Sequence, residues 1–160
     1  MMESISAAAP ETPERIGASR QIVTFWLGDA SYGLDIRSVR EIKAWMPTTS
    51  LPNTPAFVRG VANLRGMIVP ILDLGARFGR DVVQPTQTHV VIIVAVDNRF
   101  VGLLVDAVSD ITTIAVDDIM PVPEFDKSNS RGCLDGIVSI GGQLVTLISG
   151  DRVISPSALN

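Results

Sequence analysis

"GVANLRGMIVPILDL", residues 60–74, contains two apolar runs that meet at the four residues Asn-Leu-Arg-Gly. Apolar runs rich in valine, isoleucine and leucine, separated by a short polar segment with a glycine, are typical of a β-hairpin. Arg65 is the only charged residue between Gly60 and Pro70, and it lies at the expected turn. The stretch therefore predicts two antiparallel strands with an arginine at their tip.

Similar short apolar runs recur along the chain between glycine, aspartate, asparagine and proline. Two further hairpins are expected from this pattern, one joining residues 21–27 to 32–36 and the other joining residues 89–96 to 100–105. No segment has the spacing of a long amphipathic helix. The sequence therefore predicts an all-β fold with short helices.

The chain also contains an internal repeat. Residues 33–42 align without a gap with residues 102–111, and residues 60–69 align in the same way with residues 136–145. Two matches in the same order indicate the duplication of a unit of about five strands. Closing each unit into a small barrel would hide its strand edges, so we expect two β-barrel lobes.

The repeat also sets the expected boundaries. The first lobe is expected over about residues 33–79 and the second over about residues 89–149. The N- and C-terminal strands either stay in their own lobe or are exchanged between the lobes. Residues 1–19 are expected to form a flexible tail, and residues 155–160 a short C-terminal tail.

The composition excludes several classes of protein. The net charge is −4 and the isoelectric point is about 4.9, so no nucleic-acid partner is expected. The longest apolar run, residues 90–96, is far shorter than the roughly 20 residues that a membrane span needs, so direct membrane insertion is not expected. Cys133 is the only cysteine, which excludes an internal disulfide framework and is compatible with the cytoplasm.

No set of residues predicts catalysis, which needs a tuned acid or base, an activated nucleophile, a metal or a cofactor. His89, the only histidine, lies at the start of a predicted strand without metal-ligand spacing around it. Asp117 and Asp118 are adjacent, so their side chains point to opposite faces of an extended chain. We therefore expect no catalytic residue, no metal site and no cofactor.

Trp45 and Met46 either pack in the core or contribute to a protein interface, where such side chains are enriched.

Three segments resemble the CheW family of chemotaxis coupling proteins: YGLDIRSVREI, NTPAFVRGVANLRGMIVPILDLGARFG and VGLLVDAVSDI. The resemblance covers roughly residues 21–153. It implies a CheW-like domain over residues 20–154, formed by two five-stranded SH3-like β-barrels around a shared core. The same fold occurs in the kinase CheA and the coupling protein CheV, but the chain has no room for their other domains. We therefore expect a free-standing CheW-like protein.

The resemblance implies a function as well. CheW-like proteins are non-catalytic adaptors that couple the cytoplasmic tips of methyl-accepting chemotaxis receptors to the regulatory domain of the histidine kinase CheA. The expected partners are these receptors, CheA and further CheW copies in ring-shaped arrays. The expected location is the cytoplasm, with recruitment to membrane receptor arrays. An alternative is a CheW-like scaffold of a non-flagellar receptor–kinase pathway, such as one for surface motility.

The matching segments also imply site residues. The receptor-binding residues would be Val39, Glu41, Gly60, Asn63 and Arg65. Phe125, in the long loop of the second lobe, would lie at a ring-forming contact, and Trp45 and Met46 are further candidates for a kinase or ring interface. We expect Arg65 to pair with Glu41 and to present its guanidinium to a receptor helix.

Overall fold

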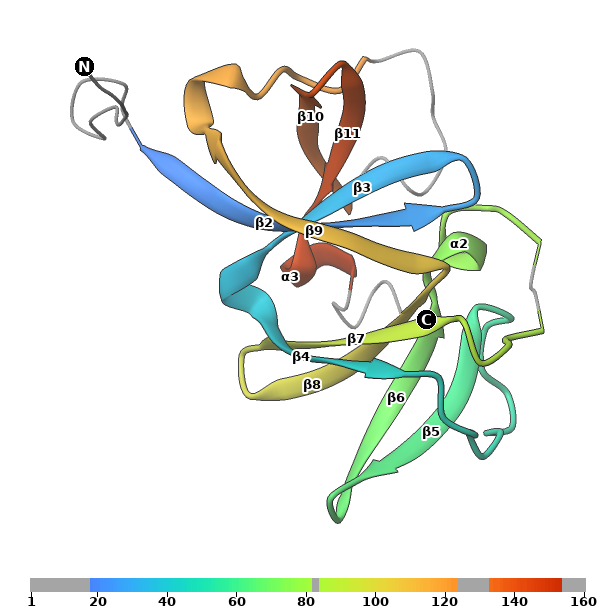
Figure 1. Cartoon of the computed structure of the whole chain (residues 1–160). Coiled ribbons are helices and arrows are strands. Elements are labelled where there is room, and N and C mark those ends of the chain that lie inside the picture. Colours follow the sequence, from blue (N-terminus) through green and yellow to red (C-terminus); the bar gives the residue numbers. More distant parts are fainter. Residues whose placement is uncertain (1–17, 82–83, 124–132, 154–160) are drawn as a thin grey trace.

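The computed structural model of the chain describes residues 18–81, 84–123 and 133–153. In this part of the chain, ten strands form two five-stranded sheets (Figure 1). The strands are β2 (Ser19–Leu27), β3 (Ala30–Asp35), β4 (Val39–Ala44), β5 (Val58–Leu64), β6 (Met67–Asp73), β7 (Val90–Val96), β8 (Arg99–Val105), β9 (Ala107–Ala115), β10 (Leu134–Ile140) and β11 (Gln143–Ile148). The short helices are η1 (Ile36–Ser38), α2 (Leu74–Arg77), η2 (Val116–Asp118) and α3 (Gly150–Val153). The predicted all-β fold of two five-stranded, SH3-like lobes with short helices is confirmed.

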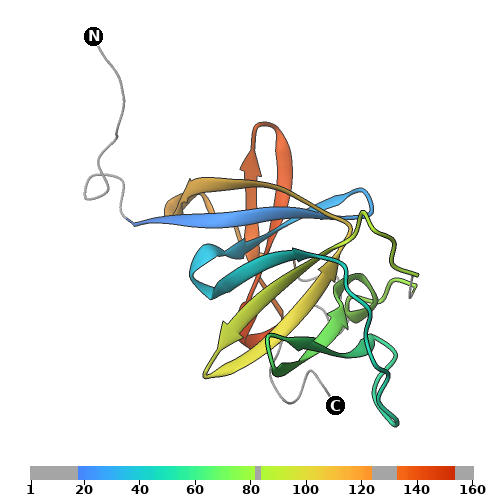
Figure 2. The ribbon, with the colours of Figure 1, turned by 60° about the horizontal axis from the view of Figure 1, so that its bottom comes forward.

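The strand order shows that the two halves of the chain exchange hairpins. One sheet has the order β4-β7-β8-β6-β5 and the other has the order β10-β11-β3-β2-β9. The β7–β8 hairpin therefore joins strands of the first half, and the β2–β3 hairpin joins strands of the second half (Figure 2). We call the sheet with β4 to β8 the first lobe and the other sheet the second lobe.

The expected residue ranges of the two lobes, 33–79 and 89–149, differ from the ranges that the two sheets contain. Residues 90–105 form β7 and β8, which pair with first-lobe strands although they lie in the segment assigned to the second lobe. The physical reason is that β8 pairs in parallel with β6, and β3 with β11, so each exchanged hairpin covers a sheet edge. At the N-terminal side, β2 begins at Ser19, the last residue of the expected tail, most of which lies outside the described residues. The expected C-terminal tail also lies outside them.

The register of the parallel pairs is the same in both lobes. Gly102 of β8 lies opposite Ile71 of β6, and Gly33 of β3 lies opposite Leu147 of β11. A Cβ atom at Gly102 would lie 2.5 Å from Cδ1 of Ile71, and one at Gly33 would lie 2.8 Å from Cδ1 of Ile22. Glycine at these positions therefore lets each exchanged hairpin pack closely against the barrel interior.

A single bridge closes each sheet between its two end strands. In the first lobe, Thr49 and Val61 exchange backbone hydrogen bonds of 2.8 and 2.9 Å, which join the segment after β4 to β5. In the second lobe, Met120 and Ile137 exchange bonds of 2.7 and 2.8 Å, which join the segment after η2 to β10. Both sheets are thereby closed into small barrels.

Three clusters of buried apolar side chains form the core. The largest lies between the lobes and contains Phe25 and Leu27 of β2 together with Leu103 and Val105 of β8, each at most 2% exposed. Each of the other clusters lies within one lobe. Because both lobes contribute to the shared cluster, they stabilise each other, as barrels of this size require.

The two α-helices follow equivalent strands and have equivalent caps. Asp73 accepts a hydrogen bond of 3.1 Å from the backbone N of Ala76 in α2, and Ser149 accepts one of 3.3 Å from the backbone N of Arg152 in α3. Within the described part of the chain, no helix has the length and apolar character needed to cross a membrane.

Candidate protein-binding site

The β5–β6 hairpin ends in a two-residue turn formed by Arg65 and Gly66. Both residues have positive φ angles, 52° and 86°, as in a type I′ turn. Asn63 stabilises the turn because its side-chain oxygen accepts a hydrogen bond of 2.8 Å from the backbone N of Gly66. Arginine is unfavourable at the first turn position, since the left-handed conformation is costly for a residue with a Cβ atom.

The equivalent hairpin of the second lobe forms the same turn without an arginine. Gly141 and Gly142 join β10 to β11, with φ angles of 57° and 83°. For glycine this backbone geometry is not strained. The Arg65 side chain is therefore not needed to build the turn, which indicates that it has another role.

Arg65 reaches from the hairpin tip to β4, the strand at the opposite end of the same sheet. Its guanidinium donates hydrogen bonds of 2.9 and 2.8 Å to the two carboxylate oxygens of Glu41. Lys43 Nζ lies 3.8 Å from one of these oxygens. The Arg65 side chain is 69% exposed, whereas that of Glu41 is 24% exposed. The structure thus contains the expected pair, and Glu41 holds the arginine in place at the surface.

The ion pair shifts the pKa values of both groups. Hydrogen bonds from Arg65 lower the pKa of Glu41, and the positive charges of Arg65 and Lys43 lower it further. The same hydrogen bonds raise the pKa of Arg65. Glu41 therefore stays ionised at a lower pH than an ordinary glutamate, and the pair persists in mildly acidic solution.

A titration followed by carbon-13 NMR should detect this shift. We expect Glu41 to titrate at lower pH in the folded protein than a glutamate does in an unfolded peptide, and to return to the ordinary range in Arg65→Gly. Because the folded pKa lies below the unfolded pKa, the pair stabilises the fold above the unfolded pKa. This contribution is lost as the pH falls through the folded pKa. An identical Glu41 titration in both proteins would show that the pair does not form in solution.

Two of the expected receptor-binding residues, Gly60 and Val39, are apolar and at least half-buried. Gly60 is buried with a φ angle of 133°, and a Cβ atom there would collide with the carbonyl oxygen of Thr49. Val39 is half-buried, pairs with Val94 and packs against the shared core. Their expected role in receptor binding stays a prediction. We call the three exposed or partly exposed polar residues the tip site: Glu41, Asn63 and Arg65.

The candidates for the kinase or ring interface lie elsewhere. Trp45 and Met46 are half-buried and pack against the apolar cluster inside the first lobe. Their positions agree with the core-packing alternative. Phe125 lies outside the described residues, so its role stays a prediction.

Two exposed isoleucines border the junction between the lobes, and sequence reasoning does not single them out. Ile42 is 42% exposed and Ile111 is 53% exposed, at equivalent positions of the repeat. They pair with Ile92 and Val23, which are fully buried. Since directly paired residues lie on the same face of a sheet, both isoleucines extend a buried face to the surface. The sequence does contain one signal for them, because the same position is an isoleucine in both copies of the internal repeat.

A second pair of exposed apolar residues lies beside the hairpin turns. Ile68 of β6 is 62% exposed, and Leu144 of β11, at the equivalent position, is 58% exposed. Ile68 pairs with Asn63, so these two side chains lie on the same face of the hairpin. Ile68 therefore places exposed apolar surface beside the tip site.

The only cysteine and the only histidine of the chain have defined surroundings in the structure. Cys133 is 2% exposed, and burial raises the pKa of its thiol, which keeps the sulfur in the less reactive form. His89 Nε2 lies 3.5 Å from a carboxylate oxygen of Asp106. Across residues 18–81, 84–123 and 133–153, no group of three or more histidines, cysteines or acidic residues could hold a metal ion.

The chain is similar to several known proteins. A family model described as "CheW-like domain" matches residues 21–157. A chemotaxis protein CheW from Rhizobium meliloti (strain 1021) is 43% identical over 134 residues, which cover 84% of this chain and 86% of that protein. Protein FrzA from Myxococcus xanthus is 32% identical over 140 residues, covering 85% and 82% of the two chains. The crystal structure of the scaffolding protein TtCheW from Thermoanaerobacter tengcongensis matches with a TM-score of 0.78 at 32% identity, covering 88% of this chain and 99% of that one. Sequence and fold together show that the chain belongs to the family of CheW-like proteins.

Proposed function

We propose that this CheW-like protein is a non-catalytic adaptor in chemotaxis signal transduction. It couples the cytoplasmic tips of methyl-accepting chemotaxis receptors to the regulatory domain of the histidine kinase CheA. It acts in the cytoplasm at membrane receptor arrays, where further copies of the chain are additional partners. The observation that carries the proposal is the tip site, an exposed arginine held by a glutamate on a fold shared with proteins named CheW.

The tip site suits a helical receptor segment. A guanidinium has five N–H donors, and Glu41 accepts a hydrogen bond from only one donor on each terminal nitrogen of Arg65. The remaining donors are available to a carboxylate or carbonyl oxygen of a partner. Ile68, on the same hairpin, adds exposed apolar surface. A receptor helix with a polar acceptor beside apolar side chains would match both properties.

We assign the binding surface for the regulatory domain of CheA to one barrel end of the second lobe. Leu144 provides exposed apolar surface next to the turn formed by Gly141 and Gly142. This hairpin has the backbone geometry of the β5–β6 hairpin but no charged side chain at its turn. Two surfaces of similar shape thus differ in chemistry, which allows one protein to bind two different partners.

A second candidate function is a scaffold in a non-flagellar receptor–kinase pathway, such as one for surface motility. Its support is that the matched relatives include one named FrzA in addition to those named for chemotaxis. The same tip site and second-lobe hairpin would serve a different receptor and kinase.

Binding measurements with two purified partners test the proposal. Calorimetry should show micromolar binding to both the CheA regulatory domain and a cytoplasmic receptor fragment, and the chain should change the rate of CheA autophosphorylation in the presence of receptors. No heat and no co-elution with the kinase domain at tens of micromolar would contradict the proposal. Deletion of the gene separates the two candidates, since loss of surface spreading with normal swimming chemotaxis would favour the second.

A further inference from the structure

The Arg65 side chain crosses the open side of the first-lobe barrel to reach Glu41. β4 and β5 are the end strands of this sheet, and the bridge between Thr49 and Val61 joins only the segment after β4 to β5. Glu41 pairs with Ile93 of β7, whereas Arg65 lies in the β5–β6 turn, 24 residues further along the chain. The two hydrogen bonds between the side chains therefore depend on the direction in which the turn points Arg65.

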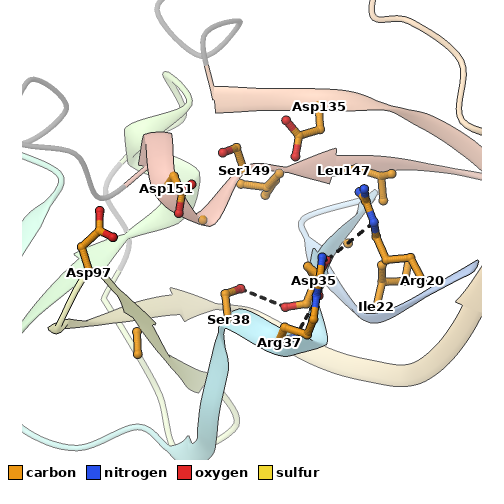
Figure 3. A pocket seen from close by; sticks show the side chains of 14 residues that line it. Arg20, Ile22, Asp35, Arg37, Ser38, Asp97, Asp135, Leu147, Ser149 and Asp151 are labelled. Atoms are coloured by element: carbon orange, nitrogen blue, oxygen red, sulfur yellow. Dashed lines mark hydrogen bonds and ion pairs between the residues drawn. The ribbon is translucent and has the colours of Figure 1, made fainter. Parts of the chain in front are cut away.

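A second ion pair of the molecule has no such dependence. Arg37 borders a cavity of about 460 Å³ and donates hydrogen bonds of 3.2 and 2.9 Å to the carboxylate of Asp35, two residues earlier (Figure 3). The same carboxylate accepts a bond of 2.8 Å from the backbone N of Arg37. The local backbone thus places both members of that pair. Arg65 and Glu41 share no local segment, so the turn itself must set the direction of Arg65.

The turn that directs Arg65 is strained. A type I′ turn needs positive φ angles at both central residues, which is costly for an arginine. A type I turn, its mirror image, has negative φ angles there and suits most residues. A change from type I′ to type I would place the N–H of Gly66 on the opposite face of the hairpin and would also redirect the Arg65 side chain. The twist of the strands opposes this change, and a contact that holds the N–H of Gly66 would oppose it further.

Asn63 provides this contact. Its side-chain oxygen accepts a hydrogen bond of 2.8 Å from the backbone N of Gly66. Asn63 is directly paired with Ile68, so its side chain lies on the face of the hairpin that carries Ile68. A type I turn would point the N–H of Gly66 away from this face and break the bond. Asn63 therefore stabilises the turn conformation in which Arg65 reaches Glu41.

The equivalent hairpin of the second lobe has neither the strain nor the contact. Ser139 stands at the position that corresponds to Asn63, and the turn is formed by Gly141 and Gly142, which adopt positive φ angles without strain. Among the residues that the structure describes, the Ser139 side chain has no hydrogen-bond partner. The side-chain contact to the turn thus accompanies the hairpin in which an arginine occupies the strained position.

We propose that Asn63 is a positioning residue of the tip site, which supports receptor binding through Arg65 rather than through a contact of its own. Its side-chain oxygen holds the strained turn, and the turn holds the guanidinium of Arg65 at Glu41. This role rests on the proposed function and extends it, because it separates the residue that meets the receptor from the residue that orients it.

The titration of Glu41 in the Asn63→Ser variant tests the positioning role without any receptor. This variant copies the second lobe. Followed by carbon-13 NMR, Glu41 should titrate at a pH between those of the wild-type chain and Arg65→Gly, because Arg65 is held at the carboxylate for only part of the time. An unchanged Glu41 titration would overturn the positioning role. A wild-type chain that does not bind the receptor would contradict the proposed function and the link to the receptor, whereas the titration would still show whether Asn63 orients Arg65.

A double-mutant cycle tests whether Asn63 acts through Arg65. Asn63→Ser should weaken binding to a cytoplasmic receptor fragment about threefold to tenfold, the worth of one hydrogen bond. In the Arg65→Gly background the same change should have no further effect, because no arginine is left to orient. Ser139→Ala, at the equivalent position, should leave both receptor binding and the Glu41 titration unchanged. Additive losses in the cycle would show that Asn63 contacts the receptor itself, and they would overturn the proposal, as would an equal loss in Ser139→Ala.

Discussion

Receptor binding is expected to fall by roughly 30-fold or more in the Arg65→Gly variant, because truncating a desolvated charge at an interface removes its charge-assisted hydrogen bonds. Glycine is the residue at the equivalent turn position of the second lobe, Gly141, so the backbone of the variant stays relaxed. The Tm and the affinity for the kinase domain should therefore be maintained. Calorimetry with each partner and thermal melting followed by circular dichroism measure these three quantities.

A matched control moves the arginine from one lobe to the other. The double variant Arg65→Gly/Gly141→Arg keeps the net charge, and φ at Gly141 is 57°, close to the 52° that Arg65 adopts. We expect this variant to remain defective in receptor binding. Recovery of receptor binding in the double variant would show that the net charge of the protein matters more than the position of the arginine. Full receptor binding by Arg65→Gly itself would show that Arg65 only keeps the hairpin tip polar.

The largest loss of stability is expected for Gly60→Ala, at about 3 kcal/mol or more. At a φ angle of 133° an alanine is strained, and its Cβ atom would collide with the backbone of Thr49. Backbone cannot move aside as a flexible side chain can, so the bridge between Thr49 and Val61 must open. Urea unfolding, compared with the wild-type chain, measures the loss.

Gly66→Ala is the matched control for this variant. Gly66 has a φ angle of 86°, but a Cβ atom there would have no neighbour within 4 Å. This variant should lose only about 1–2 kcal/mol, through backbone strain alone. Equal losses at the two positions would contradict the role assigned to the Thr49 collision. If Gly60→Ala is the less stable variant, as expected, a loss of receptor binding in it would follow from displacement of the segment after β4.

The hairpins could be predicted from the sequence because their signals are local. Pairs such as Asp97-Asn98 and Gly141-Gly142 provide residues that accept positive φ angles between two apolar runs. The exchange of hairpins could not be assigned in the same way. The parallel pairing of Gly102 with Ile71 joins residues far apart in the chain, and no turn marks it. Because no local signal marks this pairing, the sequence did not decide whether the terminal strands stay in their own lobe or are exchanged between the lobes.

The charged part of the candidate site was accessible to sequence reasoning, whereas the apolar part was not. The repeat places Gly141 opposite Arg65, which points to a role for the arginine beyond the turn. Ile42 and Ile111 resemble core residues in the sequence, because strands of this fold are apolar on the face between the lobes. Their exposure depends on where the shared core ends, and only the packing of the two lobes determines that boundary.

The exchange of hairpins has a consequence for the chain as it leaves the ribosome. Strands β4 to β8 are consecutive, so the first lobe can complete its sheet once β8 has been made. Strands β2 and β3 are made earlier, but their neighbours β9 and β11 are made late. In the interval, the β2–β3 hairpin has unpaired edges that can pair with strands of other nascent chains. The growing chain is therefore most prone to aggregate between the synthesis of β3 and that of β11. Chaperones that bind unpaired strands would act during this period.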